Sequence, residues 1–350
     1  MTRPRILALA TAVPPHRWTQ QDVVESFGEH FPRYREPRIQ RIFQGSGIET
    51  RHFVIDRASF DPSAGPDDLH ALFLSGAQEL GEAAAHRALD QARLDPGDVD
   101  YLVATTCTGY VCPGLTARLG AVLGLPDHLQ RADLVGMGCA GAMPSLQRAH
   151  DFVRAHPGRR ALVVCVEVAS ACWFVDDTLE TVVGNTLCGD GAAAAVIGAD
   201  EGLDTPTGSP ALERFATLLD AALLDSVGLE FRAGRQRIVL DKELRTGAGP
   251  LVARAVERLL EESGLGRDEI DHWIVHSGGR RVLDGIDEAL GFEDDELVHS
   301  RSVLRTHGNM SSPTLLFVLE RSQHAARPGD VGVLVALGPG LAAETGILRW

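Results

Sequence analysis

The 350-residue sequence predicts an α/β fold made of two halves that share one plan. The main observation is a repeat: a helix, a buried strand, a glycine-bearing turn with its own helix, and a Gly-x-Gly turn before a strand occur twice in the same order. Hydrophobic residues make up 44% of the chain and charged residues 23%, which is typical of a globular protein. The length suits one large domain or two similar ones.

The first repeated element is an amphipathic helix followed by a short strand. It spans residues 83–106 in the first half and 253–276 in the second, and a turn rich in Gly and Asp separates helix from strand in both. The first strand ends at Thr105-Thr-Cys-Thr-Gly109, and the second ends at His276-Ser-Gly-Gly279. We therefore expect these two segments to occupy equivalent positions.

Glycine turns supply the next two elements. Gly136-Met-Gly-Cys-Ala-Gly141 precedes a helix predicted over 142–154, and His307-Gly-Asn-Met-Ser-Ser312 precedes one predicted over 313–322. Gly189-Asp-Gly191 and Gly338-Pro-Gly340 each lead into an apolar strand. One such match arises easily by chance, whereas four in the same order do not. Ordinary alternation of helices and strands is the competing explanation.

A polar segment with several turn-forming residues separates the halves. Residues 200–210 contain two prolines and two glycines among acidic and hydroxyl side chains. The predicted organisation is an N-terminal half over 1–205 and a C-terminal half over 206–350. Two such halves suggest packed α/β layers that share a core.

Charge and composition exclude several classes of protein. With 33 basic and 48 acidic residues the net charge is −15, which disfavours a nucleic-acid partner. No apolar run reaches the roughly 18–20 residues of a membrane span. The first ten residues faintly resemble a signal peptide but lack a separate cleavage region, so they predict a first strand and a cytoplasmic protein. The six cysteines form no Cys-x-x-Cys pair, and there is no His-Glu-x-x-His, so no metal site is expected.

Cys139 is the strongest candidate for a catalytic residue. It lies in a glycine-rich turn just before a predicted helix, where the helix dipole and free backbone amides favour an anion. Such a setting can lower a thiol pKa from about 8.5 to between about 3.5 and 7.5, and so predicts a thiolate. The flanking glycines leave room for a substrate carbonyl. The alternative is a small buried apolar side chain in a turn.

The repeat places two partners near Cys139. A pseudo-twofold axis between the halves would bring equivalent turns together, and Asn309 occupies the turn equivalent to that of Cys139. His276 ends the strand equivalent to residues 101–106. A cysteine nucleophile, an imidazole and a carboxamide donor would then lie together at the bottom of one site. Taken singly, His276 would more often be a core histidine, and Asn309 a helix N-cap.

Four motifs resemble the signature set of type III polyketide synthases, the chalcone synthase-like enzymes. They are Gly138-Cys139-Ala-Gly141, Trp273-Ile-Val-His276-Ser-Gly-Gly279, Gly308-Asn309-Met-Ser-Ser312 and Gly338-Pro-Gly340-Leu-Ala-Ala-Glu-Thr345. The resemblance spans most of the chain, from Ile6 to Trp350. Val135-Gly-Met-Gly-Cys139 and the terminal Ile347-Leu-Arg-Trp350 are most similar to the bacterial 3,5-dihydroxyphenylacetyl-CoA synthase group. The fold implied is a thiolase-like five-layer αβαβα of two pseudo-twofold-related halves.

The resemblance implies a role for each site residue. Cys139 would accept an acyl group from CoA, and His276 would pair with it as imidazolium with thiolate. His276 and Asn309 would hold the thioester oxygen on which malonyl decarboxylation leaves an enolate. Two fixed donors of this kind are worth about 3–4 kcal/mol each. The implied reaction is iterative decarboxylative Claisen condensation of malonyl-CoA onto an acyl-CoA starter, followed by cyclisation to a pyrone, a resorcinol or a related phenol, with no cofactor.

Departures from the family pattern predict a roomy cavity. Cys188 stands where relatives have a bulky phenylalanine gatekeeper, and Cys107, Ala169 and Cys172 stand where plant enzymes have threonines. These small side chains predict a cavity that accepts a fatty acyl or other sizeable starter, or several malonyl units, unless larger neighbours fill the space. Ser311, Gly338, Pro339 and Gly340 from the family motifs are also assigned to the cavity. Cys112 matches a position that reaches into the partner's cavity, which implies a homodimer.

Four charged residues receive weaker assignments. Arg38, Arg41 and Arg51 lie around a segment that resembles the family's CoA-proximal region, and they are candidates for the CoA phosphates. The alternative for each is a solvated surface charge. Glu167 stands alone inside an apolar strand, so if buried it must be paired or hydrogen-bonded. It is expected to be structural first and a support for the cavity wall second.

Several other functions stay open at this point. A β-ketoacyl-carrier-protein synthase III uses the same three residue types, but its histidine normally sits in His-Gln-Ala-Asn, and here the run is His276-Ser-Gly-Gly279. A non-catalytic subunit of this fold would be expected to lack one of the three residues, and none is missing. A cysteine hydrolase would instead need water at the thioester. A synthase that uses malonyl-CoA as its only substrate is a further alternative.

Overall fold

A computed structural model describes residues 3–173, 175–176, 178–199, 208–232, 234–241, 244–293 and 295–350. The predicted boundary between residues 205 and 206 lies outside these described residues. Most of the strands belong to one sheet, in the order β11-β12-β13-β8-β1-β7-β6-β4-β5. Among the described residues, no helix combines the length and the apolar composition needed to cross a membrane.

The N-terminal half contributes five strands to this sheet. They are β1 (Pro4–Ala12), β4 (Tyr101–Thr105), β5 (Gln130–Leu134), β6 (Ala161–Glu167) and β7 (Gly191–Ala199). Strands β4 and β6 pair in parallel, whereas β7 runs antiparallel to both β6 and β1. Strands β6 and β7 are buried throughout and read as continuous apolar runs, as expected of strands covered on both faces.

The C-terminal half repeats this arrangement. Its strands are β8 (Ala211–Leu219), β11 (His272–Val275), β12 (Val331–Gly338) and β13 (Ala342–Arg349). Strands β11 and β12 are parallel, and β13 is antiparallel to β12 and β8, so these four correspond to β4, β6, β7 and β1. The half-sheets meet where Arg5 of β1 pairs with Ala211 of β8. The predicted internal repeat is therefore present in strand order and direction.

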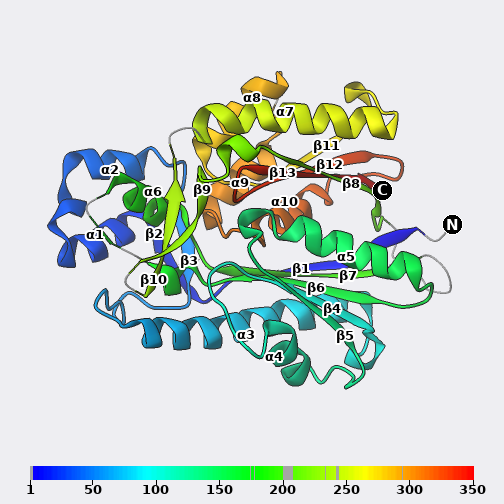
Figure 1. Cartoon of the computed structure of the whole chain (residues 1–350), viewed down its shortest axis with the longest axis horizontal. Helices are drawn as coiled ribbons and strands as arrows, with labels where there is room; N and C mark the ends of the chain where they lie inside the picture. The colour runs from blue at the N-terminus through cyan, green and yellow to red at the C-terminus, as the bar shows by residue number, and fades with distance from the viewer. Residues whose placement is uncertain are drawn as a thin grey trace.

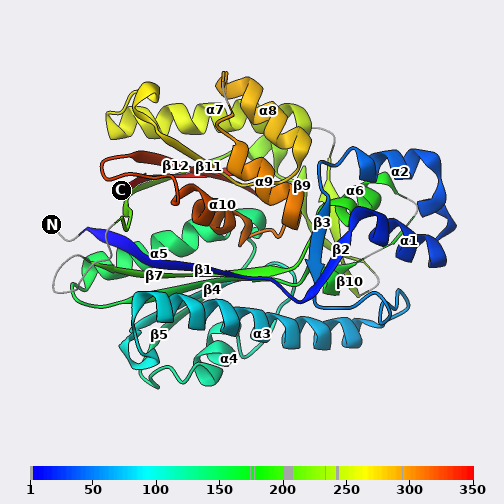
Figure 2. The same ribbon diagram turned by 180° about the vertical axis from the view of Figure 1, so that it is seen from behind.

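Helices complete five layers (Figures 1 and 2). The outer layers are α3 (Pro66–Ala92) with α4 (Leu115–Val122) on the N-terminal half-sheet, and α7 (Leu244–Ser263) with α8 (Arg280–Leu290) on the C-terminal one. Between the half-sheets lie α5 (Ala142–Ala155) and α10 (Thr314–Ser322). Apolar residues of α5 and α10 form one core with strand residues from both halves, because both helices are covered on two sides. The predicted αβαβα fold is confirmed.

Most of the remaining elements lie at one end of the molecule (Figure 1), and the last of them packs against α10. They are β2 (His16–Thr19), α1 (Gln20–His30), α2 (Pro37–Gln44), β3 (Thr50–Phe53), α6 (Leu179–Leu187), β9 (Val227–Arg232), β10 (Arg235–Leu240) and α9 (Val298–His307). Strands β2 and β3 form one two-stranded sheet, and β9 and β10 form another. An aromatic cluster that includes Trp18, Phe27, Phe53 and Trp173 packs the N-terminal part of this group together.

Candidate active site

Cys139 lies in the turn between β5 and α5, within a short 3₁₀ segment over Gly138–Ala140. Gly138 adopts a φ of 48°, and a Cβ there would lie 2.6 Å from the Pro339 ring, so this position requires glycine. A Cβ on Gly338 would likewise lie 2.8 Å from the Ala140 side chain. The Cys139 turn of the first half and the Gly338–Gly340 turn of the second therefore interlock, as the pseudo-twofold predicts.

Asn309 follows α9 and faces Cys139. Its Oδ1 and Nδ2 lie 3.9 and 3.8 Å from the Cys139 sulfur. Oδ1 accepts a hydrogen bond of 2.7 Å from the Ser311 amide, and Nδ2 donates one of 3.2 Å to the Gly278 carbonyl. These two bonds fix which way the carboxamide points, because only the NH₂ group can donate to a carbonyl. The second N–H of Nδ2 remains available on the Cys139 side.

The backbone of Asn309 is held by the segment after α6. Its amide donates to Leu187 O at 2.8 Å, and its carbonyl accepts from Gly189 N at 3.0 Å. Cys188 lies between these two residues and pairs with Asn309 in an isolated parallel bridge. Cys188 and Asn309 therefore share one short ladder that joins the two halves.

His276 lies directly after β11, where its amide donates to Val335 O at 2.8 Å. The imidazole is only 3% exposed, and neither ring nitrogen has a hydrogen-bond partner among the described residues. A Cβ on Gly278 would lie 3.6 Å from both Cδ2 and Nε2 of this ring, so the ring sits against Gly278, whose carbonyl binds Asn309. Contacts through Asn309 and Gly278 thus bring together the three residues singled out from the sequence. A buried imidazole whose two nitrogens are both unpaired can donate a hydrogen bond from its N–H to a bound ligand.

Burial acts against the thiolate that the helix start predicts for Cys139. It raises the pKa of the Cys139 thiol above its usual range; hydrogen bonds with Ser311 and Asn309 oppose this shift, and the nearby Glu167 adds to it. Burial also lowers the pKa of His276 to about 4. Both shifts favour the neutral thiol and the neutral imidazole over the ion pair, and the thiolate stays a prediction.

A cavity of about 900 Å³ opens above Cys139. Cys139, Asn309 and Gly278 line it, and the imidazole of His276 lies against Gly278. The predicted cavity residues that line it are Cys107, Ala169, Cys172, Cys188, Ser311, Gly338, Pro339 and Gly340. Cys112 does not line the cavity of its own chain and is exposed to solvent. Its assignment to a partner's cavity stays a prediction.

The additional thiols form part of the cavity wall. The Cys107 sulfur lies 3.2 Å from Ser311 Oγ, and the Cys172 thiol donates to Thr108 O at 2.9 Å and Gln236 Oε1 at 2.8 Å. Burial raises the pKa of Cys107 and of Cys172, and raises that of Cys188 to about 12. These side chains are therefore neutral and contribute a small, weakly polar surface.

Glu167 is buried at the end of β6, as its isolated position in an apolar strand predicted. Oε2 accepts hydrogen bonds from the Cys107 and Thr108 amides and from the Thr106 and Thr108 hydroxyls, at 2.9–3.1 Å. Oε1 accepts one of 2.7 Å from Ser312 Oγ. Burial raises the pKa of this carboxyl, and these bonds oppose the shift. Glu167 thereby ties the loop after β4 to the loop that carries Asn309.

Arg51 does not fit the expected CoA phosphate role. Its side chain is fully buried and donates to the carbonyls of Asn185 and Cys188 at 2.7 and 2.6 Å, and to Gln20 Oε1 at 2.7 Å. Burial lowers the pKa of its guanidinium to about 10. Strand β3 turns this side chain inward beneath the segment that holds Asn309, so a phosphate has no access to it. Arg38 and Arg41 are exposed on α2.

Sequence reasoning missed one wall of the cavity. The hairpin β9–β10 lines it with residues from both strands, including Leu229, Gln236, Arg237 and Ile238. No chemical motif marks this segment, although three arginines within six residues, at positions 232, 235 and 237, form a basic cluster that could have indicated it. Within the described residues, no group of three His, Cys, Asp or Glu side chains is placed to hold a metal ion.

Comparisons with known proteins agree with this architecture. Residues 2–201 match the family described as chalcone and stilbene synthases, N-terminal domain, and residues 222–350 match the corresponding C-terminal domain. The 3,5-dihydroxyphenylacetyl-CoA synthase of Streptomyces toyocaensis is 36% identical, with 99% of this chain and 90% of that protein covered. The 1,3,6,8-tetrahydroxynaphthalene synthase of Streptomyces peucetius subsp. caesius is 33% identical, with 99% and 93% covered.

Solved structures show the same relationship. PKS-I from the brown alga Ectocarpus siliculosus superposes with a TM-score of 0.94 at 30% identity, covering 100% of this chain and 98% of that one. The tetrahydroxynaphthalene synthase of Streptomyces coelicolor, a bacterial type III polyketide synthase, superposes with a TM-score of 0.89 at 28% identity, covering 99% of each chain. With both halves matched over their length, this chain belongs to the chalcone and stilbene synthase family and is a type III polyketide synthase.

Proposed function

We propose that Cys139 carries the growing acyl chain and that His276 and Asn309 form the oxyanion site. The observation that carries this proposal is the contact of the Cys139 sulfur with the Asn309 carboxamide at 3.8–3.9 Å. The imidazole of His276, with both nitrogens unpaired, lies against Gly278, whose carbonyl binds Asn309. In the loading step the Cys139 sulfur attacks the thioester carbonyl of an acyl-CoA, and the CoA thiolate leaves. The Cys139 proton passes to His276 and from there to the departing sulfur.

Extension uses the same two donors for a different substrate. Malonyl-CoA loses CO₂, and the electron pair of the broken bond moves onto the thioester oxygen as an enolate. The Asn309 Nδ2–H and an N–H of His276 stabilise that charge in a site from which water is excluded. The enolate carbon then attacks the Cys139 thioester, a carbon–carbon bond forms, and the Cys139 sulfur is released. These steps require no metal or redox cofactor.

The protonation state of Cys139 before substrate binds is testable. Because burial raises the pKa of the Cys139 thiol, the thiolate fraction near neutral pH is small and grows with pH. We therefore expect alkylation of Cys139 by iodoacetamide to rise about tenfold per pH unit from pH 7 to 9. Mass spectrometry of the Cys139 peptide separates this reaction from labelling of exposed Cys112. A rate that is already constant between pH 6 and 8 would show instead that a thiolate–imidazolium pair exists before substrate binds.

The cavity supports a sizeable starter. About 900 Å³ lined by aliphatic residues of the β9–β10 hairpin and by neutral thiols suits an acyl chain better than a charged group. A second candidate is use of malonyl-CoA alone, which the 36% identity to a 3,5-dihydroxyphenylacetyl-CoA synthase favours. The two differ in whether carbon from an added starter enters the product.

Product analysis decides between these substrates. Incubation with ¹³C-malonyl-CoA and unlabelled acyl-CoAs from acetyl to dodecanoyl is expected to give products that retain an unlabelled starter longer than acetyl. Mass spectrometry then gives the number of extensions, and fragmentation distinguishes a pyrone from a resorcinol. Products labelled at every carbon would support the malonyl-only reaction. Failure of every starter beyond acetyl would contradict the roomy-cavity proposal.

The CoA portion is proposed to bind near α2. Arg38 and Arg41 are exposed there, and α2 packs against α6, which lines the cavity. Two guanidinium groups at this position would offer charge-assisted bonds to CoA phosphates. An unchanged KM for malonyl-CoA after substitution of both by glutamine would contradict this assignment.

We also propose a homodimer. At the mouth of the cavity, Tyr110, Val135 and Phe231 are 70%, 57% and 74% exposed, which is unusual for large apolar side chains. A second copy of this chain would cover them and bring its own Cys112 to the cavity. A molar mass of one chain by light scattering would contradict this arrangement.

A further inference from the structure

The β9–β10 hairpin forms a wall of the cavity but has little packing of its own. Residues 227–231 and 236–240 all line the cavity, and most of β9 is exposed on its outer side. An isolated two-stranded hairpin is marginally stable in water. Its position over the cavity must therefore come from its attachments to the rest of the molecule.

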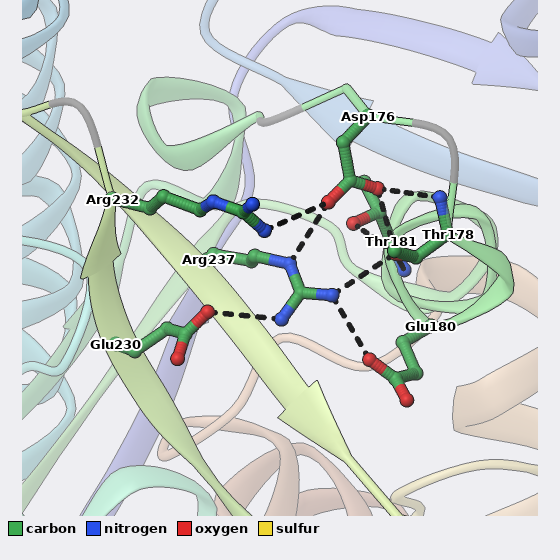
Figure 3. A network of polar contacts seen from close by, with 7 residues as sticks. All are labelled: Asp176, Thr178, Glu180, Thr181, Glu230, Arg232 and Arg237. Atoms are coloured by element: carbon green, nitrogen blue, oxygen red, sulfur yellow. Dashed lines mark hydrogen bonds and ion pairs between the residues drawn. The ribbon is translucent and has the colours of Figure 1, made fainter.

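The principal attachment is Arg237, on β10 (Figure 3). Its side chain is 9% exposed, and its guanidinium meets three carboxylates. Nε lies 3.1 Å from Asp176, Nη1 lies 2.9 Å from Glu230, and Nη2 lies 2.9 Å from Glu180. Nη2 also donates to Thr178 Oγ1 at 3.0 Å. Asp176, Thr178 and Glu180 belong to the start of α6 and the segment before it, so one side chain ties the hairpin to that helix.

The partners of Arg237 are themselves held in place. Asp176 accepts bonds of 2.8 and 2.6 Å from the amide and hydroxyl of Thr178. Glu230 lies opposite Arg237 in the register of the hairpin. The Arg237 guanidinium is nearly buried and hydrogen-bonded on all three nitrogens, and its removal would leave Asp176, which is 18% exposed, without this partner, whereas Glu180 and Glu230 are about half exposed. Arg232, by contrast, is 61% exposed and lies 3.8 Å from Asp176.

Other residues of the hairpin make further contacts: Arg235 donates to Ala64 O, and Val227 O accepts a hydrogen bond of 3.0 Å from Gly340 N. Gln236 Nε2 donates to Cys107 O at 3.1 Å. Ile238 packs so closely on α6 that a Cβ at Gly184 would lie 2.3 Å from its Cγ2. Strand β10 therefore spans the cavity from the loop after β4 to α6, and Arg237 lies between these two points. The position of β10 sets the distance between opposite cavity walls.

Arg237 is unsuited to binding a substrate anion. Three carboxylates surround one guanidinium, so the local charge is negative without any ligand. A malonyl carboxylate brought to this point would be repelled. The arrangement instead matches a structural clamp whose geometry limits the space beside the acyl chain.

We propose that Arg237 is the positioning residue that sets the width of the acyl cavity, by clamping β10 to the start of α6. The inference rests on the proposed function, because it assumes that the acyl chain grows from Cys139 into this cavity. Loss of the clamp frees β10 to move outward, and starters that the wild-type cavity excludes by length then fit. Arg237 thereby determines starter length without touching the reacting atoms.

The test is the ratio of kcat/KM for a long acyl-CoA to that for a short one, with malonyl-CoA as extender. We expect Arg237→Gln to raise this ratio about tenfold, because a gain of a few accommodated methylenes is worth that much. The effect should lie mainly in KM of the long starter. Partial unfolding lowers both rates equally and cancels in the ratio. Arg237→Lys should restore little of the wild-type ratio, because one ammonium cannot reach three carboxylates in this geometry.

Arg232→Gln is the matched control, since it removes a basic side chain from the same hairpin and loses only the exposed 3.8 Å pair. Its ratio should equal that of the wild type. If Arg237→Gln does not fold, Glu230→Gln removes one partner and should move the ratio in the same direction by a smaller factor. An unchanged ratio in a folded Arg237→Gln enzyme overturns the proposal. A wild-type enzyme that makes no polyketide from any starter would instead refute the proposed function.

Discussion

Replacing Cys139 by alanine should abolish polyketide formation while leaving decarboxylation of malonyl-CoA measurable. The sulfur is the only proposed attachment point for the chain, so its removal is expected to lower product formation by about 10⁴-fold or more. Decarboxylation needs only the two donors that face the thioester oxygen, and those remain. Release of CO₂ and of acetyl-CoA from malonyl-CoA, measured beside product formation, separates the two steps.

Cys107→Ala is the matched control for this experiment. Cys107 is another thiol of the same cavity, and its Sγ contacts Ser311 rather than the Asn309 carboxamide. We expect Cys107→Ala to continue making polyketide, with a change in product distribution at most. If Cys107→Ala abolished products and Cys139→Ala did not, the nucleophile would be misassigned.

Replacing Asn309 by alanine should slow both decarboxylation and condensation by about 10²–10³-fold, the usual cost of one oxyanion donor. Both steps place negative charge on the same oxygen, so both should fall together. Asn309→Asp should be at least as damaging to decarboxylation, because a carboxylate would stand beside the developing enolate. The measurements are kcat for CO₂ release and kcat for product formation, each with saturating malonyl-CoA.

Ser311→Ala provides the comparison for Asn309. Asn309 Oδ1 binds the backbone amide of Ser311, which the substitution retains, so the carboxamide should keep its orientation. A small effect from Ser311→Ala, together with a large one from Asn309→Ala, assigns the loss to the Asn309 donor itself. Equal losses in both variants would point instead to a general disturbance of the turn that holds these residues.

Much of the fold was predictable because the same order of helices, strands and glycine turns occurs twice in the sequence. The second half follows the first in strand order and direction, and the glycine turns at 138 and 338 interlock where a side chain would collide. Glu167 was predictable for a similar reason: a lone carboxylate in an apolar strand must find hydrogen-bond donors when buried, and it finds them in Thr106, Thr108 and Ser312. These conclusions depend on local chemistry and on the pattern along the chain.

Arg51 shows where such reasoning fails. An arginine near a CoA-like segment predicts a surface cation, but whether a side chain points outward depends on which way its strand is packed. The charge of Cys139 depends on tertiary structure in the same way, because burial of the sulfur shifts its pKa.

The sequence alone predicted the type of fold, the family and the three residues at the centre of the site, because each of these predictions depends on residue types at set spacings along the chain. Only the tertiary structure decided the volume of the cavity, the inward turn of Arg51 and the clamp on the β9–β10 hairpin. These properties arise from contacts between segments far apart in the chain. Arg237 binds residues up to 61 positions away, and no local pattern encodes the distance between two walls.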